Sequence, residues 1–140
     1  MKPKYHAYFG RWQSPHIGHK WLIDQHLSKN EKVLIFIRDV DIDEKNPFTA
    51  EEVKEMLGLA FEKEISNGLV RLEISPDIFS LNIGRGVGYD VVEHKPNDEI
   101  KSISATEIRR KIRENEDGWR EMVIPGVEDF LIKKFSGGEK

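Results

Sequence analysis

The run Val33–Ile37 constrains the fold more than any other part of this chain. Its residues are apolar without interruption, and the charged residues Lys32 and Arg38 lie on either side of it. A strand with one face in solvent alternates apolar and polar side chains, so an unbroken apolar run indicates a strand buried on both faces. Such strands are typical of parallel sheets, in which a crossover, usually a helix, connects each strand to the next.

Helical and strand patterns alternate around this run, as a parallel sheet requires. Thr49 and Glu52 form a capping box, which predicts the start of a helix. The other predicted elements are strands over Tyr5–Phe9, Leu69–Ile74 and Tyr89–Glu93, and helices over Ile17–Leu27, Thr49–Ile65, Ser104–Asn115 and Val127–Phe135. This order predicts an α/β fold, namely a Rossmann-like doubly wound parallel sheet in a single compact domain of residues 1–140.

Composition narrows the classes of function. The net charge of −3 argues against a broad nucleic-acid-binding surface. The absence of cysteine excludes disulfides, thiolate metal sites and cysteine nucleophiles. No apolar run approaches the length of a membrane span, and no apolar signal segment follows the first lysines. We therefore expect a cytoplasmic protein without a nucleic-acid or membrane partner.

The loop after the first predicted strand has the composition of a phosphate site. His16 and His19 are three residues apart at the start of a helix, so they lie on one face, where free backbone N–H groups favour an anion. Gly18 lets a ligand approach the backbone closely. A pair of capping histidines explains the pattern equally well. For a metal site, His6, His26 and His94 offer no obvious third ligand to this pair.

A second predicted helix start has similar chemistry. Ser104 and Thr106 offer hydroxyls beside free N–H groups, and Arg109 can bind phosphate through two N–H groups at once. Taken alone, this segment is better explained as a capped helix with a solvated basic face. Two such helix starts in one chain together suit a triphosphate.

These two segments resemble the HxGH nucleotidyltransferases, the superfamily of class I adenylyl- and cytidylyltransferases. The motifs are His16-Ile17-Gly18-His19, which matches HxGH, and Ile103-Ser104-Ala105-Thr106-Glu107-Ile108-Arg109, which is similar to ISSTxIR. Three further segments resemble the archaeal-type nicotinamide mononucleotide adenylyltransferases. They are Gly10-Arg11-Trp12-Gln13-Ser14-Pro15-His16, Asn46-Pro47-Phe48-Thr49-Ala50, and Gly118-Trp119-Arg120 through Val123-Pro125.

The resemblance implies transfer of a nucleotidyl group from a nucleoside triphosphate to a phosphate acceptor, with release of pyrophosphate. It assigns catalytic roles to His16, His19 and Arg109. The residues that it assigns to nucleotide binding are Phe9, Gly10, Arg11, Gly18, Ser104, Thr106 and Ile108. Mg²⁺ would be carried by the nucleotide, so no metal ligand is expected from protein side chains. The resemblance also implies a homo-oligomer.

Two departures from the archaeal-type pattern concern the acceptor. Val53 stands where that branch has an arginine, and the stretch between Pro76 and Ile103 is much shorter. The identity of the acceptor therefore stays open, with Trp12, Arg38 and Arg85 as candidate contacts. Arg85 lies within Gly84-x-Gly86-x-Gly88, which is either an anion-binding concavity or a flexible connector.

Three alternatives to adenylyl transfer follow from the same motifs. A cytidylyltransferase that uses CTP and an alcohol phosphate shares HxGH, but Asp98–Ser102 differs from the run such enzymes carry before the second helix. Class I aminoacyl-tRNA synthetases also share the motif, but this chain leaves no room for an anticodon-binding part. A nucleotide-binding module without catalysis is the alternative from another class. ATP and a small phosphate-bearing acceptor remain the predicted substrates.

Overall fold

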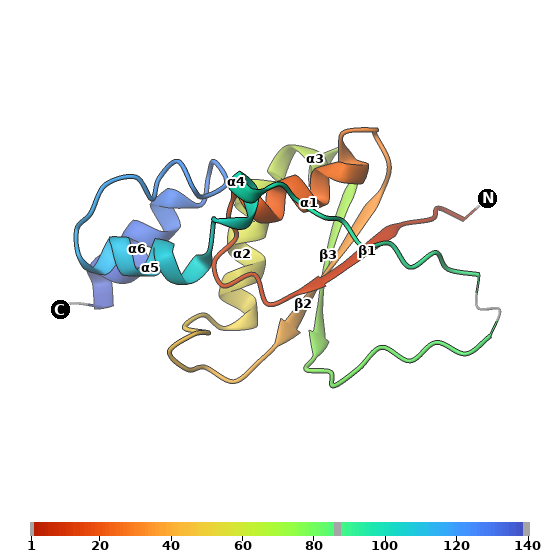
Figure 1. Cartoon of the computed structure of the whole chain (residues 1–140), viewed down its shortest axis with the longest axis horizontal. Helices are drawn as coiled ribbons and strands as arrows, with labels where there is room; N and C mark the ends of the chain where they lie inside the picture. The colour runs from red at the N-terminus through yellow and green to blue at the C-terminus, as the bar shows by residue number, and fades with distance from the viewer. Residues whose placement is uncertain (1, 86–87, 139–140) are drawn as a thin grey trace.

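The computed structural model describes residues 2–85 and 88–138 and contains a three-stranded parallel sheet flanked by helices (Figure 1). The strands β1 (His6–Gly10), β2 (Val33–Asp39) and β3 (Val70–Pro76) are hydrogen-bonded in that order. With the intervening helices they form one βαβαβ half of a Rossmann fold. The predicted Rossmann-like α/β class is confirmed.

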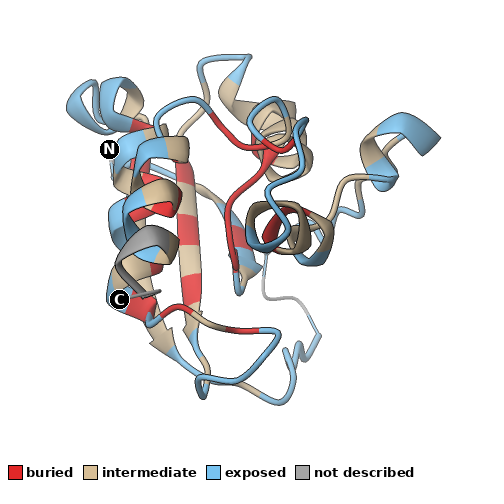
Figure 2. Cartoon of the chain, turned by 90° about the vertical axis from the view of Figure 1, so that its left-hand side faces the viewer, coloured by how far each residue is buried: buried red, intermediate tan, exposed pale blue. Residues whose placement is uncertain are grey.

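The apolar run Val33–Ile37 forms most of the central strand, as predicted. The prediction that both of its faces are buried is wrong, because Leu34 and Phe36 on the second face are only partly buried. Val33, Ile35 and Ile37 are fully buried on the face that the helices cover, and they pack beside Tyr8 of β1 (Figure 2). On the opposite face Phe36 stacks on Phe9 with 4.7 Å between ring centroids, and Phe9 remains 42% exposed. The core therefore lies between the sheet and the helices.

The helices that connect the strands begin where their caps predict. Helix α1 (Ile17–Leu27) has the predicted bounds, and Thr49 caps α2 (Ala50–Ala60) in a complete capping box with Glu52. The single helix predicted to reach Ile65 is interrupted at Phe61, where the backbone leaves helical geometry before α3 (Glu62–Ser66). The Phe61 ring is 1% exposed, so the break accompanies burial of a large aromatic side chain.

The segment from residue 77 to 97 contains neither helix nor strand in its described residues. The prediction of a strand over Tyr89–Glu93 is wrong, because these residues have no strand partner and their side chains are exposed. A strand pattern is stabilised only by a neighbouring edge. The glycine-rich stretch before it lies partly outside the described residues, at Gly86 and Val87.

The last third of the chain packs beside α2. It contains α4 (Asp98–Lys101), which the sequence did not predict, α5 (Ala105–Arg113) and α6 (Glu128–Gly138). Lys134 of α6 pairs with Glu52 of α2 at 2.6 Å, and the ring of Phe135 contacts that of Phe48 edge to face. None of the helices described is long and apolar enough to cross a membrane.

Candidate active site

The two predicted phosphate-binding segments lie together beyond the carboxyl end of β1. They surround a cavity of about 380 Å³. The residues that line this cavity are Arg11, Trp12, Gln13, His16, His19, Lys45, Ile103, Ser104, Ala105, Thr106 and Arg109. Residues 11–19 and 103–109 are far apart in sequence, so the tertiary fold brings them to the position where ligands bind in open α/β sheets.

Buried polar contacts hold the loop after β1 in place. The side-chain amide of Gln13 donates to the carbonyl of Phe48 and accepts from the Phe48 N–H, both at 3.0 Å. The Trp12 indole N–H donates to the carbonyl of Phe36 at 3.0 Å. Gln13 is 5% exposed, and its role in positioning the loop was not predicted. The only signal for it was its place inside the run from Gly10 to His16.

His16 and His19 form a reciprocal cap at the start of α1. His16 Nδ1 accepts from the backbone N–H groups of Gly18 at 3.0 Å and His19 at 3.3 Å, while His19 Nδ1 accepts from the His16 N–H at 3.1 Å. Since both Nδ1 atoms accept hydrogen bonds, the proton of each neutral ring lies on Nε2. Capping therefore fixes the tautomer of both histidines and leaves Nε2–H as the free donor of each ring.

Burial keeps both imidazoles neutral. It lowers the pKa of His16 from 6.5 to about 4, and it lowers the pKa of His19 well below its ordinary value, with a further contribution from the nearby His16. The rings stack with 3.7 Å between centroids, and the edge of Trp12 meets His19 at 4.9 Å. Two neutral N–H donors can bind phosphate oxygens without electrostatic repulsion between the rings.

Gly18 and Gly10 have no Cβ atom, and a neighbouring aromatic ring occupies the place where that atom would lie. A Cβ atom on Gly18 would lie 2.8 Å from His16 Cε1, and one on Gly10 would lie 2.7 Å from the Trp12 ring. Real Cβ atoms do not approach other heavy atoms so closely. The two glycines therefore allow His16 and Trp12 to fold back against the backbone of the loop.

The C-terminal part of the chain also supports the start of α1. The backbone N–H of Ile17 donates to the carbonyl of Met122 at 2.7 Å, and His16 forms an antiparallel bridge with Val123. Trp119, in the same tail segment, is 6% exposed, and the guanidinium of Arg120 lies 4.9 Å from its ring centroid. The tail thus contributes directly to the geometry of the histidine motif.

The start of α5 supplies the other wall of the cavity. Ser104 caps this helix by accepting from the Glu107 N–H at 3.1 Å. Arg109 is 4% exposed, donates to the backbone carbonyl of Gln13 and lies 3.4 Å from the Thr106 hydroxyl. Burial lowers the pKa of Arg109, with smaller contributions from other arginines. This guanidinium directly connects the two phosphate-binding segments.

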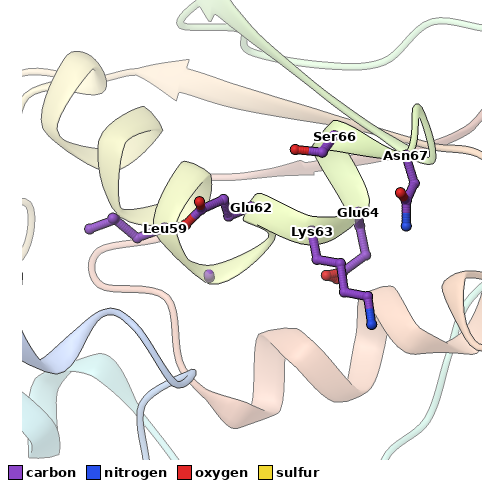
Figure 3. A pocket seen from close by; sticks show the side chains of 7 residues that line it. Leu59, Glu62, Lys63, Glu64, Ser66 and Asn67 are labelled. Carbon is purple, nitrogen blue, oxygen red and sulfur yellow. The ribbon is translucent and has the colours of Figure 1, made fainter.

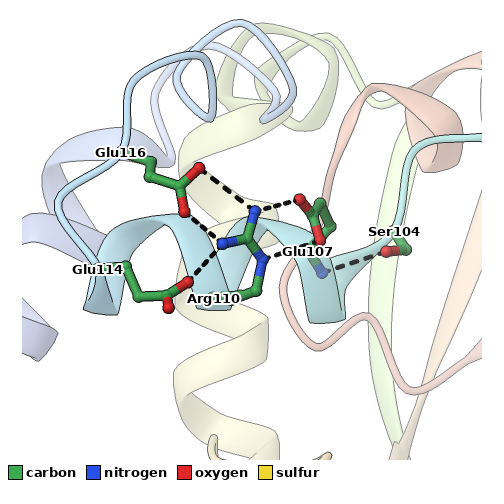
Figure 4. A network of polar contacts seen from close by, with 5 residues as sticks. All are labelled: Ser104, Glu107, Arg110, Glu114 and Glu116. Carbon is green, nitrogen blue, oxygen red and sulfur yellow. Dashed lines mark hydrogen bonds and ion pairs between the residues drawn. The ribbon is translucent and has the colours of Figure 1, made fainter.

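Arg110, the next residue, has the opposite environment (Figure 4). It pairs with Glu107 at 2.6 Å and also contacts Glu114 and Glu116. These carboxylates raise the pKa of Arg110. Glu107 pairs with Arg110, so the cap at the start of α5 consists of the Ser104 side chain alone, without a second bond from Glu107 back to the backbone. Arg110 is thus neutralised within the protein, whereas Arg109 has no salt bridge among the described residues.

The cavity has the electrostatics of an anion site. Arg11, Lys45 and Arg109 line it, and no carboxylate does. Two helix N-termini add partial positive charge at the same place. Arg109 forms no ion pair among the described residues, although the nearby charge of Asp43 acts against the lowering of its pKa. A buried arginine in such a position is stabilised when an anion binds beside it. Lys45 was not predicted, although it directly precedes the motif segment that begins at Asn46.

Several predicted contacts do not line the cavity. The Ile108 side chain is fully buried in the core, and Phe9 lies on the other face of the sheet, where it stacks on Phe36. Arg38 donates to Asp77 at 2.8 Å, and Arg85 is exposed in the segment after β3. Their assignment to nucleotide or acceptor binding stays a prediction.

A second hollow of about 440 Å³ lies over α2 and α3 (Figure 3). Its lining includes Glu62, Lys63 and Glu64, so charges of both signs mix there. Leu59 is 42% exposed at its margin. No buried polar group lines it, and it lacks the focused positive charge of the first cavity.

Comparison with known proteins shows which family this chain belongs to. No protein-family model matches the chain. A nicotinamide-nucleotide adenylyltransferase of Sulfurisphaera tokodaii is 28% identical over 94% of this chain and 91% of that protein. Nicotinamide-nucleotide adenylyltransferase 1 of Sulfolobus acidocaldarius is 30% identical over 94% of this chain and 90% of that protein's length. The chain belongs to this family. Family membership confirms the predicted nucleotidyltransferase and favours adenylyl over cytidylyl transfer.

The adenylyltransferase relatives are longer than this chain. The identity to the Sulfurisphaera protein is counted over 160 positions, whereas this chain has 140 residues. That relative therefore has at least 20 residues at positions where this chain has none. The expectation that the stretch between Pro76 and Ile103 is the shortened one stays a prediction.

Proposed function

We propose that this protein transfers the adenylyl group of ATP to nicotinamide mononucleotide and releases pyrophosphate. The observation that carries this proposal is the carboxylate-free cavity, in which two helix N-termini, three cationic side chains and two neutral histidines meet. Such a set of donors matches the charge of a triphosphate. The names of the two relatives support the donor and the acceptor.

In this mechanism the protein supplies position and charge stabilisation, and no protein nucleophile is needed. The acceptor phosphate attacks the α-phosphorus of ATP in line, a P–O bond to the acceptor forms, and the bond to pyrophosphate breaks. Nε2–H of His16 and His19 would donate to phosphoryl oxygens, where negative charge develops in the transition state. Arg109, Ser104 and Thr106 would hold the β- and γ-phosphates, and Arg11 would bind from the first loop.

Mg²⁺ would accompany the nucleotide and neutralise part of its phosphate charge. Hard cations prefer oxygen ligands, above all carboxylates and phosphates. The cavity lining described above contains no carboxylate, and its Gln13 amide is already paired with Phe48. Phosphate oxygens and water are therefore the ligands that remain for this ion.

Pyrophosphate release tests the donor and the acceptor together. ATP and CTP would each be combined with nicotinamide mononucleotide, phosphopantetheine, glycerol 3-phosphate and phosphocholine. We expect the fastest release with ATP and nicotinamide mononucleotide. Faster release with CTP and an alcohol phosphate would replace this proposal with cytidylyl transfer. ATP binding without turnover on any acceptor would favour a nucleotide-binding module.

The acceptor contacts form a separate part of the proposal. Trp12 lines the cavity, whereas Arg38 and Arg85 lie on segments that lead away from it. Comparing KM for each acceptor between the wild type and Arg85→Ala tests the assignment. A rise in KM for nicotinamide mononucleotide, with an unchanged KM for ATP, is the expected result.

Assembly and location are also proposals. Phe79, Tyr89 and Val91 expose large apolar side chains in the segment after β3, which favours a homo-oligomer in which a second copy covers them. Light scattering of the purified protein tests this. A cytoplasmic location and the absence of nucleic-acid partners stay predictions from composition.

A further inference from the structure

A second histidine cluster lies at the opposite end of α1 from the phosphate site. It consists of His6 on β1, His26 in the last turn of α1 and Glu31 in the connection to β2. One ligand atom from each lies within 4.8 Å of the others. Three separate elements therefore direct metal-binding atoms toward a common point.

The geometry of the cluster centres on the Glu31 carboxylate. Its Oε1 lies 2.9 Å from His26 Nδ1 and 3.7 Å from His6 Nε2. The two imidazole rings stack with 3.6 Å between centroids and an interplanar angle of 8°. Tetrahedral zinc sites, with bonds of about 2.0 Å, separate ligand atoms by about 3.3 Å. The three ligand atoms are close to this spacing, and one imidazole would rotate out of the stack so that all three point to one ion.

Neighbouring groups extend the cluster. The ring of His94 lies 5.6 Å from that of His26, nearly perpendicular to it, and 6.4 Å from that of Tyr8. The Tyr8 hydroxyl is buried and has no hydrogen-bond partner among the described residues. A fourth ligand from His94, or a metal-bound water, would give this hydroxyl a partner nearby.

The charge at this end of the helix favours a cation. The C-terminus of α1 has partial negative charge, and Glu31 adds a full negative charge. Two imidazoles with one carboxylate are a common ligand set for zinc and other divalent transition metals. The phosphate site at the other end of the same helix has no carboxylate in its lining.

We propose that His6, His26 and Glu31, with His94 as the fourth ligand, bind Zn²⁺ or a similar divalent transition-metal ion at a site separate from the nucleotide cavity. Bound metal would connect β1, the end of α1 and the segment before α4. Its role would be structural, because it would tie residue 94 to the sheet. In the sequence, His6, His26 and His94 offer no obvious third ligand to His16 and His19. The expectation that no side chain binds a metal comes from the family resemblance, which implies that the nucleotide carries Mg²⁺.

The ordinary alternative is a hydrogen-bonded contact that needs no metal. In that case the His26–Glu31 pair and the histidine stack hold the α1–β2 connection against β1 by themselves. The two interpretations differ in one measurable respect, since only a metal site binds Zn²⁺ with a stoichiometry of one and depends on all of its ligands.

Calorimetry with ZnCl₂ on untagged, chelator-treated full-length protein tests the proposal. We expect one Zn²⁺ per chain and a higher Tm with the metal. His6→Gln and His26→Gln should each weaken binding by at least about tenfold. Co²⁺ in place of Zn²⁺ should give the visible absorption of a four-coordinate site, and His94→Gln should alter that spectrum.

A double variant at the other end of α1, His16→Asn with His19→Gln, is the matched control. It should bind Zn²⁺ as the wild type does, because it leaves this cluster intact. Loss of Zn²⁺ binding in the control would indicate that the metal binds at the phosphate site, and it would overturn the proposal. Absence of stoichiometric binding to the wild type, or undiminished binding to folded His6→Gln and His26→Gln, would also overturn it. None of these readouts depends on adenylyl transfer.

Discussion

Helix α1 has a stacked histidine pair at each end, and the two pairs have opposite surroundings. His16 and His19 stack at 3.7 Å at its N-terminus, beside Arg109 and a carboxylate-free cavity. His26 stacks at 3.6 Å on His6 at its C-terminus, beside Glu31. The same side chain thus occurs in two similar pairs with different partners.

The comparison shows that the surroundings decide what an imidazole binds. At the N-terminus, backbone N–H groups occupy Nδ1 of His16 and His19, so only N–H donors remain for an anion. At the C-terminus, the helix carbonyls and the carboxylate of Glu31 favour a cation instead. The following four predictions test this contrast, from the largest expected effect to the smallest.

His19→Ala should reduce the rate of pyrophosphate release by about a thousandfold, because a donor to the developing phosphoryl charge is lost. The cap would also be lost, since His19 Nδ1 accepts from the His16 N–H at 3.1 Å. His19→Gln is the matched variant, because glutamine at this position can reach back to the same N–H. We expect it to be as inactive as His19→Ala but more stable. Recovery of activity in His19→Gln would contradict the role of Nε2–H.

Protein stability should fall as the pH decreases from about 6.5 toward 4. The pKa of folded His16 is lowered from 6.5 to about 4, so between these values the unfolded state binds more protons. The stabilisation is complete above pH 6.5, and His16 alone accounts for a loss of about 1.4 kcal/mol per pH unit below it. His19 adds to this loss, because burial lowers its pKa as well.

Urea unfolding at several pH values across that window measures the slope. His16→Asn should reduce the slope, because asparagine caps the helix through an oxygen that does not take up a proton in this range. The slope that remains comes from His19, because burial also lowers its pKa. An unchanged slope in His16→Asn would show that other groups cause the acid sensitivity.

Gly18→Ala should destabilise the phosphate end of α1 by about 1–3 kcal/mol, because its Cβ would collide with the His16 ring. Gly58→Ala is the matched control in α2. No atom lies within 4 Å of a Cβ at that position, so this change should stabilise the protein by about 0.5–1 kcal/mol. Urea midpoints compare the two variants, and equal effects would contradict the proposed crowding at Gly18.

Glu31→Gln should have the smallest effect when no metal is added. The hydrogen bond with His26 lowers the pKa of Glu31, and its carboxylate is 43% exposed, so solvent screens the pair. We expect a slightly lower Tm, with a difference that shrinks at high salt, and unchanged pyrophosphate release. A loss of turnover at unchanged Tm would contradict the separation of the two histidine pairs.

Much of the fold follows from local sequence. The apolar run of β2, the bounds of α1 and the Thr49 cap depend on neighbouring residues alone, and the structure agrees with each. Local rules fail where a distant partner decides the outcome. The segment Tyr89–Glu93 has a strand pattern but does not pair with the outer edge of β1 or of β3, and α2 ends where the Phe61 ring enters the core.

In the candidate site, too, some features follow from local sequence and others depend on the tertiary fold. The sequence by itself identified the candidates for phosphate binding, because helix caps and motif spacing are local properties. These candidates are His16, His19, Ser104, Thr106 and Arg109. Only the tertiary structure joined them, through the contact from Arg109 to the Gln13 carbonyl. Such contacts depend on how whole elements pack, so short-range patterns do not contain them.

The second histidine pair shows this limit most clearly. In sequence, His6, His26 and Glu31 have no shared motif, and the two histidines lie 20 positions apart. Parallel pairing of β1 with β2 brings His6 opposite Val33, close to the end of α1. The cluster therefore exists only because a strand and a helix end meet at one edge of the sheet.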